Sequence, residues 1–305
     1  MGPTAAGKTD LAIALVNELP CELISVDSAL IYRDMSIGSA KPDEVTLKKY
    51  PHKLIDILDP SQNYSVAEFR RDAMTAMHEI TQRGHIPLLV GGTMLYFKAL
   101  EDGLAELPGS NDSVRKALME RMLLEGLDSL HQELAQIDPV SAARIHANDT
   151  QRLIRALEVY QLTNVTMTEH YRAQAINKSY QFPYALSKFA VAPLDRSVLH
   201  ERIAKRFMHM LENGFIEEVE YLRERGDLGM DLPSMRSVGY RQVWSYLDER
   251  INYQQLCDQG ISATRQLAKR QLTWLRKWND IHWLHDNEQN NLLHILQYLR
   301  HSSIV

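Results

Sequence analysis

The chain has 305 residues, 45% of them hydrophobic and 24% charged, with a formal net charge of -5. This composition is ordinary for a globular protein of one large or two modest domains, and the net charge provides no global attraction for nucleic acid. Two distant cysteines, Cys21 and Cys257, form no metal or disulfide pattern, and no apolar run reaches membrane-spanning length. With no recognisable secretory signal, the sequence predicts a cytoplasmic protein without a membrane partner.

The first motif is GPTAAGKT, which matches the phosphate-binding pattern G-x-x-x-x-G-K-[ST]. Glycines let the backbone curl so that its N–H groups point inward, and the next helix directs its positive end to the same point. Lys8 adds a charge for phosphate oxygens, and the Thr9 hydroxyl can hold Mg²⁺. The predicted phosphate contacts are Gly2, Pro3, Thr4, Ala5, Ala6, Gly7, Lys8 and Thr9. A glycine-rich turn without a ligand is the alternative.

A loop of this type normally follows a buried strand, and no such strand precedes Gly2 in this sequence. Without it a parallel sheet would lose a central member and leave two rows of backbone groups unpaired. We therefore expect the first strand to be missing through truncation or a misplaced initiation codon. We also expect the chain to be poorly stable as written.

The first third of the chain alternates between predicted helices and strands. Helical spacing covers 11–19 and 67–83, and Gly84 ends the second of these helices. Apolar runs predict buried strands over 21–27, 52–58 and 86–93. This order predicts an α/β fold with a parallel sheet covered by helices on both faces.

The middle of the chain, about 111–172, has helical periodicity and little strand character, which predicts an inserted all-helical subdomain. Pro108, Gly109 and Pro183 lie near its borders. The predicted domains are a core of residues 1–108 and 184–285, an insertion of residues 109–183, and a tail of residues 286–305 with no assigned structure. Within the second part of the core we expect a strand over 186–193 and helices over 200–213, 215–225 and 262–278.

Asp27 ends the strand-like run CELISVD. Ligands of open parallel sheets lie beyond the carboxyl ends of the strands, so Asp27 is expected to face the phosphate loop. Its pattern alone permits three roles: a general base, a Mg²⁺ ligand, or the N-cap of a following helix. Thr93, which closes the strand-like run IPLLVGGT, permits either a substrate contact or a cap of the next helix.

Arg202 and Arg206 lie four residues apart and therefore on one helix face. Both can reach a diphosphate from there. The alternative is that they are ordinary solvated surface arginines.

A series of six motifs closely resembles the bacterial tRNA dimethylallyltransferases, also called tRNA isopentenyltransferases, of the IPP transferase family. In chain order they are GPTAAGKT, SVDSALIYRDMSIGSAKP, LLVGGTMLYFKAL, NDTQRLIRALEVY, SVGYRQVW and ATRQLAKRQLTWLR. The resemblance covers residues 1 to about 284 and departs from the family at the missing first strand. It implies a P-loop NTPase-like core.

The resemblance also implies an activity. The dimethylallyl group of dimethylallyl diphosphate would move to the exocyclic amine of adenine 37, beside the anticodon of certain tRNAs, and pyrophosphate would leave. Asp27 would accept the amine proton, and Thr93 and Arg206 would act beside the substrate. Arg202 would be a further diphosphate contact, and Mg²⁺ at Thr9 would stabilise charge on the leaving oxygens.

Three basic segments are candidate RNA contacts. In 264–278, Arg265, Lys269 and Arg276 fall on one helical face, and we expect Trp274 and Trp278 to be core residues of another face. A solvated basic face is the alternative there. In the other two segments, 151–155 and 236–241, the alternatives are an Arg155–Glu158 ion pair and a half-buried Tyr240 that does not stack on a base.

By resemblance these segments would bind the tRNA anticodon stem-loop, with the target adenine flipped out towards Asp27. The predicted contacts are Asp27, Ser28, Ala29, Leu30, Arg115, Gln151, Arg152, Leu153, Ile154, Arg155, Arg236, Ser237, Val238, Gly239, Tyr240, Arg241, Lys269, Arg270, Gln271, Leu272, Thr273, Trp274, Leu275 and Arg276. The protein is expected to act as a monomer.

Three other functions share parts of this pattern. An ATP-dependent small-molecule kinase would share the loop and Mg²⁺ but would leave the basic helix unexplained and release ADP. A prenyltransferase acting on free adenine nucleotides would have little use for the basic segments. A non-catalytic RNA-binding protein would tolerate the loss of Asp27.

Overall fold

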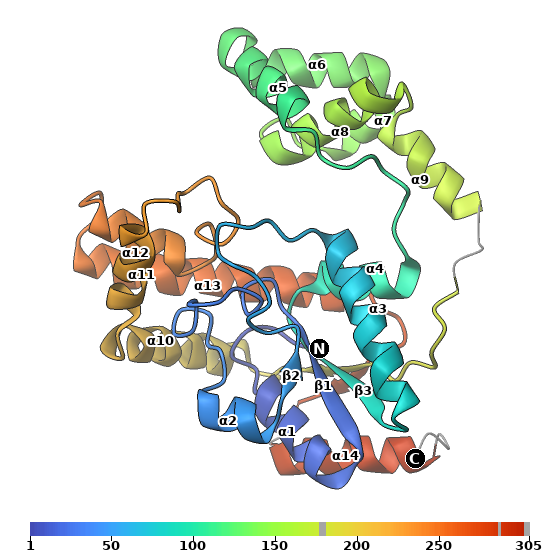
Figure 1. The fold of residues 1–305 in the computed structure, drawn as a ribbon, viewed down its shortest axis with the longest axis vertical. Helices are drawn as coiled ribbons and strands as arrows, with labels where there is room; N and C mark the ends of the chain where they lie inside the picture. The colour runs from blue at the N-terminus through green and yellow to red at the C-terminus, as the bar shows by residue number, and fades with distance from the viewer. Residues whose placement is uncertain (177–180, 286–287, 302–305) are drawn as a thin grey trace. The chain divides into compact units, whose positions relative to one another are not determined.

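A three-stranded parallel sheet lies at the centre of the larger part of the molecule (Figure 1). Its strand β1 (Cys21–Val26) pairs with β2 (His52–Lys53) on one side and with β3 (Ile86–Gly91) on the other. A second parallel sheet pairs β4 (Phe189–Val191) with β5 (His282–Leu284). The structure, a computed structural model, describes residues 1–176, 181–285 and 288–301.

Fourteen helices are present in the described residues. The helices of the first part are α1 (Lys8–Glu18), α2 (Glu44–Lys49), α3 (Val66–Gln82) and α4 (Met94–Asp102). Those of the middle part are α5 (Asp112–Glu125), α6 (Leu127–Ile137), α7 (Pro139–Arg144), α8 (Thr150–Thr163) and α9 (Met167–Ile176). The last part adds α10 (Arg196–Glu212), α11 (Phe215–Glu224), α12 (Tyr240–Leu247), α13 (Tyr253–Leu275) and α14 (Glu288–His301). None of these is long and apolar enough to cross a membrane.

The chain divides into two compact units, one of residues 1–101 and 184–305 and one of residues 102–183. The smaller unit is all-helical in its described residues and closes around its own core, which includes Leu118, Leu130, Leu134, Leu153 and Leu157. The larger unit carries both sheets and every residue of the predicted phosphate loop. Residues 177–180 of the predicted insertion and 286–287 and 302–305 of the predicted tail lie outside the described residues.

Most early elements match their prediction, because their apolar spacing is unambiguous. The strand predicted over 52–58 is wrong beyond Lys53: Leu54 and Asp56 have positive φ angles of 65° and 55°, which a strand does not permit. Lys41 forms an ion pair with Asp56, so tertiary contacts override the local β-propensity there.

Two C-terminal helices differ from the prediction. Helix α13 begins at Tyr253, nine residues before the predicted start at 262, because Asn252 and Gln255 form a capping box that starts the helix. The tail, to which the sequence assigned no structure, contains α14, whose Ile295 packs against Leu11 and Leu15 of α1. A single buried stripe is a weak pattern in so polar a segment, which explains why it was missed.

Met1 lies between the two sheets. Its carbonyl oxygen accepts from the Val191 amide of β4 at 2.9 Å, and its α-amino group donates to the Phe189 carbonyl at 2.8 Å. Burial and the Lys8 charge lower the pKa of this α-amino group to about 5. Strand β3 is an edge strand of its sheet, and its residues 86–90 are only half-buried.

We expect a short apolar strand fused ahead of Met1 to raise Tm by a few degrees. It would continue the parallel pairing of Met1 with β4, cover the free edge of β3, and replace a buried amine by an amide. Thermal unfolding of the fusion, compared with a Gly/Ser extension of equal length, measures the effect. Equal Tm values for the two fusions would show that this space does not take up a strand.

Candidate active site

The phosphate loop curls at the start of α1. Ala5 and Gly7 have φ angles of 63° and 83°, and the helix begins at Lys8 directly after Gly7. Gly2 packs so closely on β4 that a Cβ there would lie 2.5 Å from the Val191 carbonyl oxygen. The loop therefore has the curled backbone that its motif predicts, with a helix N-terminus facing the space it encloses.

Two cations and one carboxylate lie close together at this loop. Lys8 Nζ donates to the Pro3 carbonyl at 2.7 Å, and Arg206 Nη2 donates to the Thr4 hydroxyl. Burial lowers the pKa of Lys8 to about 8; Asp27 opposes this shift, and Arg206 adds to it. Burial lowers the pKa of Arg206 too, again opposed by Asp27. Two desolvated cations beside one carboxylate favour the arrival of a further anion.

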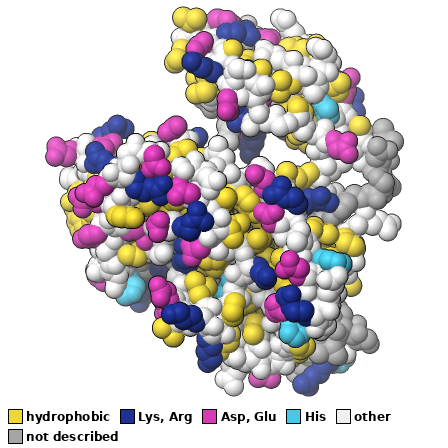
Figure 2. Space-filling view, in the orientation of Figure 1, with side chains coloured by type: hydrophobic (Ala, Val, Ile, Leu, Met, Phe, Trp, Pro, Cys, Tyr) yellow, Lys and Arg dark blue, Asp and Glu magenta, His cyan; other side chains and the backbone are white. Residues whose placement is uncertain are grey.

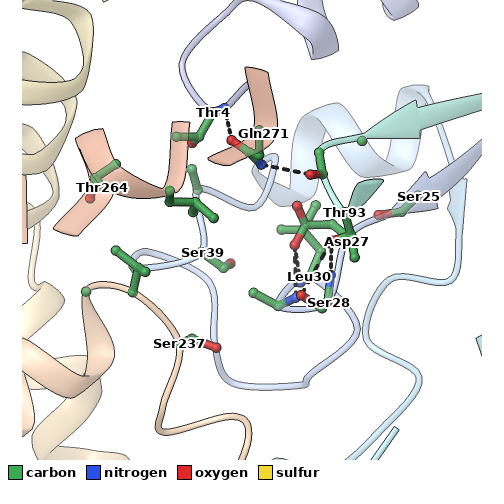
Figure 3. Close-up of a pocket in the computed structure, with 18 of the residues that line it drawn as sticks. Thr4, Ser25, Asp27, Ser28, Leu30, Ser39, Thr93, Ser237, Thr264 and Gln271 are labelled. Atoms are coloured by element: carbon green, nitrogen blue, oxygen red, sulfur yellow. Dashed lines mark hydrogen bonds between the residues drawn. The ribbon is translucent and has the colours of Figure 1, made fainter. Parts of the chain in front are cut away.

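Asp27 follows the last residue of β1, at its carboxyl end. Its Oδ1 accepts from the amides of Ala29, at 2.9 Å, and Leu30, at 3.4 Å, and so fixes a turn (Figure 3). No helix follows this turn, so the predicted alternative of a helix N-cap is not realised. Within the described ranges Oδ2 has no hydrogen-bond partner, and the side chain lines the adjacent cavity. One oxygen therefore holds the turn while the other is available to a substrate.

Thr93 lies at the end of the neighbouring strand and reaches across to the same turn. Its amide donates to the Val26 carbonyl at 3.2 Å, and its hydroxyl oxygen accepts from the Ser28 amide at 3.1 Å. The side chain thus fixes the segment that carries Asp27 (Figure 3).

A cavity of about 570 Å³ joins these groups. One part of the cavity is polar and is lined by Thr4, Lys8, Thr9, Asp27 and Arg206. Figure 3 labels ten of the residues that line the cavity as a whole. Helices α10 and α13 form an apolar wall of the cavity, which consists of Ile203, Phe207, Met210, Leu267 and Trp274. Phosphate and hydrocarbon can therefore be bound side by side in one cavity.

Another wall of the cavity is formed by the loops 38–42 and 233–240, which Glu218 of α11 joins. Glu218 Oε2 accepts from the amides of Ser36 and Ile37 at 2.8 and 2.6 Å. Its Oε1 accepts from the Gly38 amide at 3.1 Å and from the Tyr240 hydroxyl at 2.6 Å. One side chain thus fixes two segments of the lining that are about two hundred positions apart in sequence.

The structure brings about half of the predicted substrate residues into one cavity. Thr4, Lys8, Thr9, Asp27, Thr93 and Arg206 line it, as do 28–30 and 236–240. Arg202 is exposed and does not line the cavity. Arg270, Gln271 and Trp274 of α13 also line it, whereas Lys269 of the same helix and Arg276, its C-cap residue, are exposed.

Several side chains differ from their predicted surroundings. Trp274 is 37% exposed and lines the cavity, so the prediction that it is a core residue is wrong; Trp278 is buried and donates from Nε1 to Glu101 at 2.6 Å. Tyr240 is fully buried, more than the half-buried alternative required, and its ring cannot stack on an RNA base. Burial likewise withdraws the side chains of Leu153, Ile154, Gln271 and Leu275 from the surface. These positions lie on the core-facing side of their helices.

The predicted contacts in the smaller unit surround a buried acid. Glu158 is completely buried, and its Oε1 accepts from Arg115 Nε at 3.0 Å while its Oε2 accepts from Arg155 Nη1 at 2.7 Å. The Arg155–Glu158 ion pair that the sequence left open is therefore formed. Arg152, in contrast, is mostly exposed and pairs with Asp149. On the drawn face of the molecule, basic and acidic side chains are interspersed, so neither sign of charge dominates this face (Figure 2).

Sequence reasoning assigned no role to Glu218, Ser25 or His52, although Ser25 and His52 line the cavity. Nothing local distinguishes Glu218 from other helical acids. Ser25 has a sequence indication, because it lies two residues before Asp27 on the same face of β1. Gln271 was predicted as an RNA contact. Its spacing from the buried Ala268 and Leu275 indicates that it lies on the inward-facing side of α13.

These features define a P-loop α/β protein that can bind a phosphorylated, partly apolar small molecule beside a carboxylate. The chain belongs to the IPP transferase family: the family model of that description matches residues 30–278, and the isopentenyl transferase model matches residues 1–57.

Solved structures agree with this assignment. The tRNA isopentenylpyrophosphate transferase of Bacillus halodurans is 35% identical, with a TM-score of 0.71 over 98% of this chain and 93% of that one. That of Staphylococcus epidermidis is 31% identical, with a TM-score of 0.70 over 99% and 97%. A eukaryotic dimethylallyltransferase acting on tRNA is 27% identical, with a TM-score of 0.75 over 93% and 72%.

Proposed function

We propose that this protein transfers the dimethylallyl group of dimethylallyl diphosphate to the exocyclic amine of adenine 37 in tRNA and releases pyrophosphate. The observation that carries the proposal is the single cavity in which the phosphate loop, Asp27 and an apolar wall meet. Membership of the IPP transferase family supports the reaction class, and the tRNA-acting structural relatives support tRNA as the acceptor. Neither observation favours a small-molecule kinase.

The reaction follows from the positions of the side chains. The amine nitrogen bonds to the allylic carbon as the bond from that carbon to the diphosphate oxygen breaks. Lys8, Arg206 and the loop amides hold the departing diphosphate, whose charge grows as the bond breaks. Oδ2 of Asp27 takes the proton that the amine loses, while Thr93 holds the turn that carries Asp27. The apolar wall of α10 and α13 would cover the dimethylallyl group.

Thr9 is the residue that would hold Mg²⁺. Its hydroxyl lies in the cavity lining beside Lys8 and Asp27, and oxygen donors suit this ion. The described residues contain no group of three or more acidic, His or Cys side chains for a metal. This fits an ion that takes most of its ligands from the diphosphate and water, and when bound it would offset the diphosphate charge.

The acceptor would enter from the side of the two joined loops. A stacked adenine cannot reach Asp27 and the allylic carbon together, so the base must leave the anticodon-loop stack. Ser28, Ala29, Leu30 and the loop 236–240 border the space next to Asp27 and would contact it. The candidates for contacts with the RNA backbone are exposed side chains: Lys269 of α13, its C-cap residue Arg276, Arg241, and the insertion residues Gln151 and Arg152.

A transfer assay tests the proposal. The protein is mixed with Mg²⁺, radiolabelled dimethylallyl diphosphate and unmodified tRNA, with free AMP as a parallel acceptor and an ATP reaction analysed for ADP. We expect label on tRNA and none with Asp27→Ala. Label on AMP alone would indicate the free-nucleotide reaction, and ADP formation without transfer of label would indicate a kinase.

Replacing Lys269 by Ala is expected to weaken tRNA binding and lower its salt dependence by about one phosphate contact. The side chain is exposed on α13, next to cavity-lining Arg270. Filter binding over a salt series measures the slope, and Lys48→Ala, at an exposed site on α2, is the matched control. An unchanged slope for Lys269→Ala would mean that this face does not contact RNA.

A further inference from the structure

We propose that Gln271 is a positioning residue that holds the phosphate loop in its binding conformation. This inference rests on the proposed function of the loop as a diphosphate site. Gln271 belongs to α13, which also presents Arg270 and Trp274 to the cavity. Gln271 therefore links α13, whose basic side is the candidate RNA contact, to the phosphate loop.

Both ends of the Gln271 amide are used inside the protein. Oε1 accepts from the Thr4 amide of the loop at 2.8 Å, and Nε2 donates to the Gly92 carbonyl beyond the end of β3 at 2.8 Å (Figure 3). Only 8% of the residue is exposed. These two bonds and the burial of the side chain support a role for Gln271 in holding the loop, beside its predicted contact with tRNA.

Gln271 packs tightly against the phosphate loop and the end of β3. A Cβ on Gly92 would lie 2.4 Å from Nε2 and 3.2 Å from the Gly2 carbonyl oxygen, so loop, strand end and amide are in direct contact. Ala268 and Leu275 are buried on the same side of α13. The helix thus fixes the amide, and the amide fixes the loop.

The loop needs this support because its conformation is strained. Ala5 has a φ of 63°, a left-handed conformation that costs free energy in a residue with a side chain and persists only when its surroundings hold it. The preceding residue, Thr4, is held twice, through its amide by Gln271 and through its hydroxyl by Arg206. Arg206 is also a candidate diphosphate contact, whereas the two hydrogen bonds of Gln271 are both made to the backbone of the protein.

Gln271→Met tests the proposal, since it keeps the volume of the side chain and removes both hydrogen bonds. Calorimetric titration with pyrophosphate and Mg²⁺ should show binding roughly tenfold weaker than in the wild type. Affinity for unmodified tRNA should be unchanged. Gln259→Met, the same substitution at an exposed position of α13 outside the basic segment, should leave both affinities unchanged.

Gly92→Ala approaches the same contact from the opposite side. Its Cβ would displace the Gln271 amide, so the single variant should lose pyrophosphate affinity as Gln271→Met does. Gln271→Ala makes room for this Cβ, and the double variant should therefore lose less than the sum of the two single effects. Additive effects would show that the two residues do not act through one contact.

The outcomes separate this inference from the function on which it rests. A folded wild type that binds no pyrophosphate would overturn the proposed diphosphate site. A wild type that binds it and a Gln271→Met variant that binds it equally well would overturn the positioning role alone. A parallel loss of pyrophosphate and tRNA affinity in Gln271→Met would assign the residue to general stability and would also overturn the proposal.

Discussion

Asp27→Asn is expected to lower kcat for dimethylallyl transfer by about 10²–10⁴-fold, the usual contribution of a positioned base. Asn can still accept the Ala29 and Leu30 amides through Oδ1, so the turn beside the loop is retained. It cannot take the proton that the adenine amine must lose. Single-turnover transfer to tRNA, with both substrates saturating, measures the chemical step directly.

Binding measurements complete this test. Pyrophosphate and tRNA affinities of Asp27→Asn should stay close to those of the wild type, apart from a modest gain for the anion once the carboxylate charge is removed. Asp258→Asn, an exposed site on the distal part of α13, provides the same chemical change outside the cavity and should leave kcat unchanged. A variant of Asp27 that retains nearly full kcat would assign the proton to another acceptor.

Lys8→Ala is expected to weaken binding of Mg²⁺–pyrophosphate by roughly 10- to 100-fold, the range for a lost charge-assisted hydrogen bond. Lys8 Nζ donates to the Pro3 carbonyl at 2.7 Å, which places the ammonium group at the loop. Transfer should fall with diphosphate binding, while tRNA affinity stays nearly intact. Calorimetric titration and filter binding on the same preparation separate the two affinities.

Stability distinguishes this effect from unfolding. Lys8 is a desolvated cation close to Arg206, and its burial already lowers its pKa, so its removal should not lower Tm. Lys205→Ala, at the exposed position beside Arg206, is the matched control and should leave pyrophosphate affinity unchanged. An equal loss of diphosphate and tRNA binding in Lys8→Ala would contradict the separate roles of loop and basic helix.

Much of the fold follows from local patterns in the sequence. Where the spacing of apolar residues or glycines fits only one type of element, the prediction lies close to the observed bounds. This holds for the phosphate loop, β1, β3, α1 and α3. The segment after His52 was not, because the Lys41–Asp56 pair and two left-handed residues decide its path. Such contacts join residues that no short window contains.

The candidate site likewise combines residues that the sequence predicted with residues whose role only the structure identified. Asp27, Thr93 and Arg206 were named from motifs or from the family resemblance, and the structure brings them to one cavity. The groups that hold them in place were not identified in that role. Glu218 gathers three successive amides and a tyrosine hydroxyl, and Gln271 joins residue 4 to residue 92. These are properties of packing, so only the folded chain reveals them.

The contact between Gln271 and the phosphate loop also bears on synthesis. The loop leaves the ribosome well before the amide that holds Thr4, because that amide lies 267 positions later in the chain. A growing chain therefore carries a complete loop motif for most of its translation without the support that keeps the loop in shape. Full diphosphate affinity should therefore appear only after α13 has emerged, so products of premature termination should bind the prenyl donor more weakly than the complete protein.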